Sequence, residues 1–507
     1  MPQIRSASRF YLTGPTKFES TYGKCNLPLL TDQMVKKIPE QFMTLNNLAA
    51  VTSYIDDNFD HSVDRLIEWL KIPSVSTDSQ FDAEVLRAAN WMGDQLSNLG
   101  FNVKMIKTAG HPVLYAERKS KTVDAPTALY YGHYDVQPGD PFELWDTAPF
   151  EPVIKDSKYG KKIVARGAQD DKGQVMTFIE AFRAWIEVAG DLPCNVKIML
   201  EGEEETGSPS LAGFLAANKD LLKADFCVVC DTGMWDIDTP AITYSLRGLV
   251  DATISITGPN RDLHSGMYGG AVVNPLHALS SIVAQLHDQN GKVQIADFYD
   301  GVPEIGAEER AELAALNHDD EGFFGEIGLS GAAGEPEFST LEKLWARPTC
   351  DINGMWGGYI GEGHKTVIAS QASLKLSCRL VGDQDPHAIL KNLEAFFNER
   401  LPKDFTMTLK NHGTGVAAKL PVDSPYLQAA KAGLDQVFDN PTKLIGMGGS
   451  IPAVGQIKET LGLESIMVGF GLSDDNIHSP NEKYELTCLQ RGIRSHAAIL
   501  AKLAEVK

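Results

Sequence analysis

The segment that decides the fold reads Val196-Lys-Ile-Met-Leu-Glu-Gly-Glu-Glu-Glu-Thr-Gly-Ser208. It begins as a short apolar run, which is typical of a buried strand, and continues into four acidic residues: Glu201, Glu203, Glu204 and Glu205. Carboxylates crowded at a strand end repel one another unless a positive charge lies among them. A solvated acidic loop is the simplest interpretation of one charged run. The tight Thr206-Gly-Ser208 turn and similar residues elsewhere in the chain favour a ligand site.

Other predicted strands also end on groups that bind metals. Ala128–Tyr131 is a buried run that leads into His133 and Asp135, and Asp225–Cys230 leads into Asp231. His133 and Asp135 are two residues apart, so they lie on the same face of an extended segment. Strands that alternate with helices predict an α/β sheet with helices on both faces, and ligands in such sheets collect beyond the carboxyl ends of the strands.

Two adjacent acids, Asp170 and Asp171, precede a clear amphipathic helix. One interpretation is that they cap the helix and complement its dipole. Two aspartates so close to Gly173 also suggest a shaped ligand loop. We therefore expect Asp170, with His133, Glu204, Glu205 and Asp231, at the strand ends of the α/β sheet.

The pattern changes near Tyr244, where Val250–Ile256 and Ser373–Leu380 alternate strictly between apolar and polar residues. Such alternation is typical of antiparallel strands with one buried face. We expect an inserted α+β domain over residues 243–412, between catalytic parts at 47–242 and 413–507. We expect residues 1–46 to form an N-terminal extension that is a candidate for disorder; alternatively, the residues before Met43 lie upstream of the true start.

Composition restricts the class of protein. The 507 residues carry a net charge of −21, which argues against nucleic-acid or anionic-membrane partners. We find no apolar run long enough to span a membrane and no signal-peptide core. Seven scattered cysteines favour a reducing cytosol, and Cys227 and Cys230 fit a buried strand better than a redox or zinc motif.

Two histidines and several carboxylates suit zinc, alone or with a second divalent ion. In order along the chain, the segments Gly132–Asp135, Arg166–Gly173, Glu201–Ser208, Cys230-Asp231 and His478-Ser-Pro-Asn-Glu482 resemble the five metal-site motifs of one family. It is the family of dizinc metallopeptidases that includes aminoacylases, glutamate carboxypeptidases and carnosinases. The family's fold is a zinc-peptidase-type catalytic domain, with a mixed sheet flanked by helices, plus an inserted lid and dimerisation domain.

The resemblance implies a role for each site residue. Asp170 bridges two metal ions, most often Zn with Mn or Co as alternatives; His133 and Asp231 hold one ion, and Glu205 and His478 hold the other. Glu204 is the general base, Asp135 orients His133, and the Asp170–Asp171 peptide bond is cis. This chain departs from related sequences at Glu203, which precedes the Glu204-Glu205 pair.

The inserted domain resembles the family's lid. Asp262–Gly270 matches the segment that crosses a homodimer and presents His264 to the partner's substrate. Four further positions match those that hold the substrate's carboxylate end: Thr366, Arg379, His412 and Ser450. The loop Gly446–Ser450 lacks the lysine and spacing of a phosphate-binding loop.

These residues predict a homodimeric, cytoplasmic, dinuclear dipeptidase or related exopeptidase, and the long lid resembles the carnosinase branch. The alternative within enzymes is an amidohydrolase that removes N-acyl or N-carbamoyl groups from amino acids with the same metal site. A binding or scaffold protein is the alternative from another class, and the complete ligand set with Glu204 argues against it.

Overall fold

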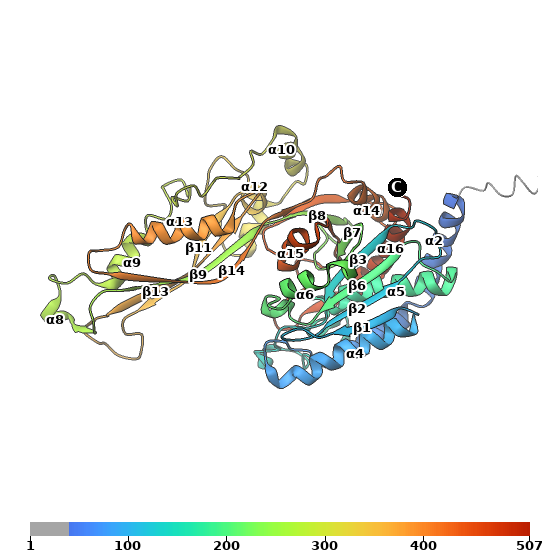
Figure 1. The fold of residues 1–507 in the computed structure, drawn as a ribbon, viewed down its shortest axis with the longest axis horizontal. Helices are drawn as coiled ribbons and strands as arrows, with labels where there is room; N and C mark the ends of the chain where they lie inside the picture. Colours follow the sequence, from blue (N-terminus) through green and yellow to red (C-terminus); the bar gives the residue numbers. More distant parts are fainter. Residues whose placement is uncertain (1–39, 507) are drawn as a thin grey trace, which may run out of the picture. The chain divides into compact units, whose positions relative to one another are not determined.

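The computed structural model describes residues 40–506 (Figure 1), and the chain from Thr44 onward forms one compact unit. Its first helix, α2 (Glu40–Asp57), starts earlier than predicted, so residues 40–46 of the expected extension are helical. Residues 1–39 of that extension lie outside the described part. A turn at Asn58 separates α2 from the next helix, α3 (Phe59–Leu70).

A mixed sheet of nine strands forms the centre of the described chain, in the order β1-β2-β6-β3-β7-β17-β8-β15, with β16 paired to β8. The strands are β1 (Asn102–Ile106), β2 (Val113–Arg118), β3 (Thr127–His133), β6 (Asn195–Glu201), β7 (Phe226–Val229), β8 (Ala241–Leu246), β15 (Ala418–Lys419), β16 (Lys443–Met447) and β17 (Ser465–Met467). β6, β3, β7 and β17 run parallel to one another, so their carboxyl ends share one edge.

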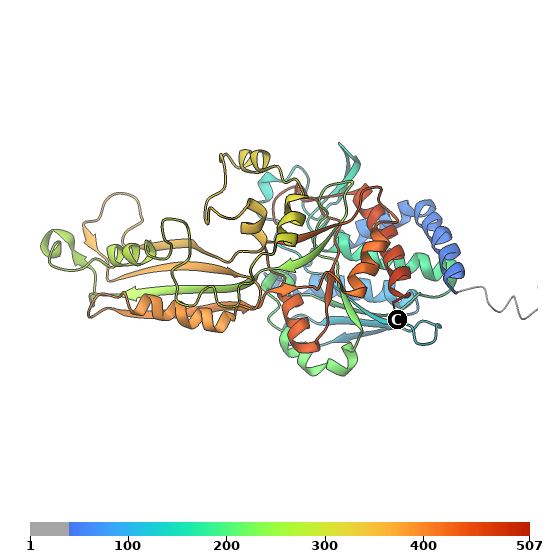
Figure 2. The same cartoon turned by 90° about the horizontal axis from the view of Figure 1, so that it is seen from above.

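Helices cover both faces of this sheet, as the α/β pattern predicts (Figures 1 and 2). One face packs on α2, α3, α4 (Asp82–Asn98), α5 (Lys172–Ala189), α14 (Pro425–Leu434) and α16 (Leu486–Leu503). The other packs on α6 (Leu211–Ala217), α7 (Lys219–Leu222) and α15 (Pro452–Leu461). Adjacent residues on β3 face opposite sides of the sheet: Tyr130 packs against Phe178 and Phe182 of α5, whereas Tyr131 belongs to the core beneath α6. Burial on both faces explains why these strands are apolar throughout.

A small antiparallel sheet, in the order β18-β5-β4, places two loops beside each other. It consists of β4 (Val153–Ser157), β5 (Gly160–Val164) and β18 (Lys483–Glu485). β5 precedes the loop that carries Asp170, and β18 directly follows Glu482. The expectation that Asp170 lies at a strand end of the central sheet is therefore wrong. Asp170 lies in the loop between β5 and α5.

The inserted part contains a second sheet, in the order β11-β13-β9-β14, and every neighbouring pair is antiparallel as predicted. Its strands are β9 (Gly248–Thr257), β11 (Thr349–Gly357), β13 (Gln371–Leu380) and β14 (Thr406–Gly415). One face packs on α9 (Pro275–Val283) and α13 (Pro386–Asn398) to make a separate core, and the other face is polar. We call this sheet and its two helices the lid; division of the chain at 243 and 412 stays a prediction.

Shorter elements complete the insertion. A two-stranded pair, β10 (Leu263–His264) and β12 (Val367–Ile368), adjoins α8 (Ser265–Tyr268). Residues 301–345 of the insertion, rich in Gly, Glu and Ala, contain α10 (Ala307–Ala314), α11 (Asp320–Glu326) and α12 (Thr340–Trp345). Over residues 40–506, no helix combines the length and the apolar character needed to cross a bilayer.

Candidate metal centre

Three parallel strands deliver the first ligand candidates to one edge of the sheet. His133 is the last residue of β3, and Asp231 follows β7 by two residues. β6 ends at Glu201 and leads into a short 3-10 helix, Glu204–Thr206, that carries Glu204 and Glu205. Because β3 pairs in parallel with both β6 and β7, these side chains meet beyond the same strand ends.

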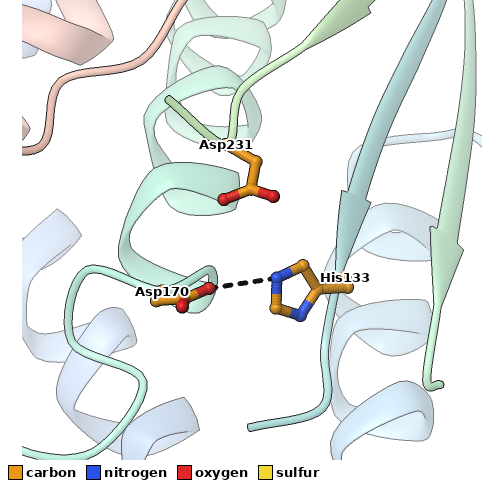
Figure 3. A group of neighbouring side chains, drawn as sticks. All are labelled: His133, Asp170 and Asp231. Atoms are coloured by element: carbon orange, nitrogen blue, oxygen red, sulfur yellow. Dashed lines mark ion pairs between the residues drawn. The ribbon is translucent and has the colours of Figure 1, made fainter. Parts of the chain in front are cut away.

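Asp170 belongs to two groups of converging ligand atoms. In the first, with His133 and Asp231, all ligand atoms lie within 4.8 Å of one another (Figure 3). The second group contains Asp170, Glu205 and His478. Asp170 directs Oδ1 to His133 Nε2 at 3.1 Å and Oδ2 to His478 Nε2 at 2.9 Å. One carboxylate that turns a separate oxygen to each group has the geometry of a bridging ligand.

The negative charge of the clustered carboxylates favours the binding of cations. Burial, with the nearby negative charge of Asp170, raises the pKa of Asp231 well above its ordinary value. Burial also raises the pKa of Glu204 to about 7, and Glu205 and Asp170 add to that rise. Acids this close cannot all be ionised without a compensating positive charge. The two groups share Asp170 and offer imidazole nitrogens and carboxylate oxygens. Divalent ions that accept both kinds of ligand, such as zinc, fit this set.

The loop around Asp170 is held by Glu482, a residue whose role the sequence did not reveal. The buried Glu482 carboxylate accepts hydrogen bonds from the backbone N–H groups of Gln169 (3.0 Å), Asp170 (3.1 Å) and Gly167 (3.0 Å). It also accepts one from Arg166 Nη1 at 2.7 Å. Arg166 and Glu482 occur in two of the quoted motifs. Their opposite charges were the one feature of the sequence that could have predicted this contact.

The Asp170–Asp171 peptide bond is cis, as the resemblance implies. Asp171 stands at the N-cap position of α5, but its side chain makes no capping hydrogen bond. Its carboxylate instead accepts the backbone N–H of His133 at 3.0 Å. Asp171 therefore joins the α5 loop to β3, and the capping interpretation of its side chain is wrong.

His264 and the predicted substrate-binding residues fall into two groups. At the β10–β12 pair, His264 is exposed, and Ser265 N donates to Thr366 O at 3.0 Å. In the second group, Arg379 Nη1 donates to Ser450 Oγ at 2.9 Å, and Arg379 and His412 line one pocket. Within residues 40–506, no hydrogen bond or ion pair joins His264 to the metal-ligand candidates.

Comparison with known proteins gives the family. The model of peptidase family M20/M25/M40 matches residues 129–502. The chain is 29% identical over 482 residues to the Cys-Gly metallodipeptidase dug1 of Schizosaccharomyces pombe, covering 92% of this chain and 99% of that one. It is 30% identical over 481 residues to the human Beta-Ala-His dipeptidase, covering 90% and 93%. An M20 family metallo-carboxypeptidase of Sulfolobus solfataricus has a similar structure, with a TM-score of 0.78 and 31% identity over 88% of this chain and 99% of that one.

The chain belongs to this peptidase family. The resemblance drawn from the five motifs is confirmed, as is the dipeptidase branch. This M20 peptidase is thus a metal-dependent hydrolase with two groups of candidate metal ligands. The ion that it binds, the role of each residue and the oligomeric state stay predictions.

Asp135 in this M20 peptidase contacts three parts of the centre. Its Oδ1 lies 3.4 Å from His133 Nδ1, whose nearest acceptor is the backbone oxygen of Asp135 at 3.1 Å. Its Oδ2 accepts hydrogen bonds from Ser76 Oγ (2.6 Å) and from the Glu205 backbone N–H (3.1 Å). Asp135 thereby holds the His133 ring and the Glu205 turn together. Neither Ser76 nor Gln137, which donates to Glu205 Oε2 at 2.7 Å, belongs to any motif that the sequence offered.

The four acids that opened the sequence analysis have separate functions. Glu201 is buried and accepts hydrogen bonds from Tyr131 Oη and Ser208 Oγ. Glu203 accepts the backbone N–H groups of His111 and Ser210, so it fixes the neighbouring loops. Only Glu204 and Glu205 remain for the metal centre, and the extra acid Glu203 does not disturb their register. Cys227 and Cys230 are buried in β7 and directly after it, as predicted for core residues.

We expect Glu482→Gln to weaken divalent-metal binding by about 10- to 100-fold, the usual cost of losing a partner that orients a ligand. The amide nitrogen cannot accept two of the four hydrogen bonds that hold the Asp170 loop. Competition with a chelator, on the folded metal-free protein, measures the effect. Glu485→Gln is the matched control, because this buried acid contacts Ser157 and Lys483 instead of that loop. Unchanged metal affinity in Glu482→Gln would contradict the assignment.

Proposed function

We propose that this M20 peptidase hydrolyses the peptide bond of dipeptides by water attack in a two-metal centre. The observation that carries the proposal is the sharing of Asp170 between two ligand groups, His133 with Asp231 and Glu205 with His478. Two divalent cations bound there lower the pKa of an attacking water and polarise the substrate carbonyl. Zinc is the ion we expect, with manganese or cobalt as substitutes.

Glu204 supplies the proton transfers in this proposal. It lies on the same turn as Glu205 but outside both ligand groups, so its carboxylate can accept and return a proton. Glu204 takes a proton from the attacking water as the new C–O bond forms. It then gives that proton to the leaving nitrogen as the C–N bond breaks. Asp135 orients His133 throughout.

The lid supplies the contacts to the rest of the substrate. Arg379, His412 and Ser450 are assigned to its carboxylate, because Arg379 and His412 share a pocket and Arg379 contacts Ser450. Thr366, which directly precedes β12, is assigned to the same carboxylate end. A guanidinium presents parallel donors that match a carboxylate. Recognition of both the scissile bond and a free carboxylate selects the peptide bond next to the carboxyl-terminal residue.

We further propose a homodimer in which His264 serves the partner's centre. Large apolar side chains are exposed in the inserted part that carries His264: Met267 (75%), Trp356 (43%), Tyr359 (47%) and Ile360 (88%). A second copy of this chain would cover them, as apolar patches of this kind often mark interfaces.

Free, buried cysteines in the described chain agree with the predicted cytoplasmic setting.

A substrate screen tests the function. The metal-loaded enzyme is offered Gly-containing dipeptides and the N-acetyl and N-carbamoyl forms of the same amino acids, with zinc, manganese or cobalt. Chelated protein is the blank. We expect release of amino acids from dipeptides at rates well above those from acylated amino acids. The opposite order would favour the amidohydrolase alternative, and activity in verified metal-free protein would contradict the two-metal centre.

A further inference from the structure

The polar face of the lid sheet contains a pocket of about 390 Å³. Arg379 and His412, the residues assigned above to the substrate carboxylate, line it together with Asp251. Asp251 has no role in the metal centre and matched no motif. An acid beside two groups that are meant to bind an anion requires an explanation.

Strand alternation points Asp251 into the pocket. On β9, Val250 and Ala252 are buried in the lid core, so Asp251 lies on the opposite, polar face. Its cross-strand neighbours are Ser377 on β13 and Gly413 on β14. Ser377 has a small side chain and Gly413 has none, so there is room for a ligand group beside the Asp251 carboxylate.

The Asp251 carboxylate is half-buried, and none of the described residues donates a hydrogen bond to it or forms an ion pair with it. Three basic residues line the pocket with Asp251: Arg379, His412 and Lys375. Arg379 Nη1 contacts Ser450 Oγ, His412 Nε2 lies 2.8 Å from Thr253 Oγ1, and Lys375 forms no ion pair with Asp251. Burial raises the pKa of Asp251, although the charges of Arg379 and His412 oppose the rise. A carboxylate partly removed from water without a donor costs free energy, and such groups are often found at binding sites.

We propose that Asp251 determines specificity, by accepting a cationic side chain of the substrate's carboxyl-terminal residue. This inference rests on the proposed function, in which Arg379 and His412 hold that residue's carboxylate. The side chain begins one carbon from the carboxylate, so it falls within the same pocket. An ammonium or guanidinium group gains a charged hydrogen bond there, whereas an acidic side chain meets Asp251 as a like charge.

The test compares Gly-Lys with Gly-norleucine, which has a similar chain but no ammonium group. We expect the wild-type enzyme to favour Gly-Lys by about tenfold or more in kcat/KM. In Asp251→Asn this ratio falls toward one, while kcat/KM for Gly-norleucine stays within about twofold. Asp351→Asn is the matched control, because Asp351 also flanks Ser377 but does not line this pocket; it keeps the wild-type ratio. An unchanged ratio in Asp251→Asn, or an equal loss for both substrates, would overturn the proposal.

Binding of the free amino acids separates this inference from the proposed function. Calorimetry with lysine and norleucine on the metal-loaded proteins should show tighter binding of lysine, lost in Asp251→Asn and kept in Asp351→Asn. If that preference holds and no dipeptide is cleaved, the proposed function fails and the role of Asp251 stands. If dipeptides are cleaved with no lysine preference in either assay, only the role of Asp251 fails.

Discussion

Glu204→Gln should leave a folded protein that binds two metal ions per chain and has lost about 10²- to 10⁴-fold in kcat, the usual contribution of a general base. Glutamine keeps the size of the side chain and much of its hydrogen bonding but cannot take a proton from water. Glu204 is adjacent to Glu205, yet only Glu205 lies in a ligand group, with Oε2 at 3.2 Å from His478 Nε2. The two neighbours are therefore expected to fail in different ways.

Metal content distinguishes them. Glu205→Gln removes a ligand, so it should lower metal content and activity together, whereas Glu204→Gln should lower activity alone. Metal analysis after gel filtration, with kcat on a dipeptide, measures both quantities. A Glu204→Gln protein that loses metal along with activity would mean that the roles of these two residues have been exchanged.

The sequence predicted those parts of the site that follow directly from strands. His133, Glu204, Glu205 and Asp231 come after apolar runs, and parallel strands bring their carboxyl ends to one edge. No long-range information is needed for that step. The same reasoning predicted the antiparallel lid sheet, because apolar and polar residues alternate in β9 and β13, which indicates that one face of the sheet is buried.

Loop positions could not be derived in this way. Asp170 reaches the centre through a loop that Glu482 holds. These two residues are 312 positions apart in the sequence, and only the tertiary structure brings them together. The resemblance to a family gave Asp170 and His478 their roles, whereas spacing alone wrongly placed Asp170 at a strand end. For Asp251, alternation gives the face but not the neighbours, since those depend on the register of β9 against β13 and β14.

His264→Ala is expected to lower kcat/KM by about 10²- to 10³-fold, the usual effect of removing one donor to the developing oxyanion. His264 is exposed at the end of β10, where its Nδ1 accepts the backbone N–H of Gly266 at 3.0 Å. That bond leaves Nε2 free to carry a proton toward a substrate oxygen. Since no described contact links His264 to its own chain's ligands, the donor is expected to act on the partner's substrate.

Mixed dimers decide between action within a chain and between chains. His264→Ala and Glu204→Gln chains are each inactive, but a dimer with one of each has one complete site, made of Glu204 from the first and His264 from the second. Random exchange makes half of the dimers mixed, so activity should rise toward about a quarter of wild type. Labelled subunits confirm that exchange has occurred. Absence of recovery after proven exchange would place His264 in its own chain's site or restrict it to a structural role. Recovery near a quarter requires that the complete active site be built from two chains, because neither variant contains both groups.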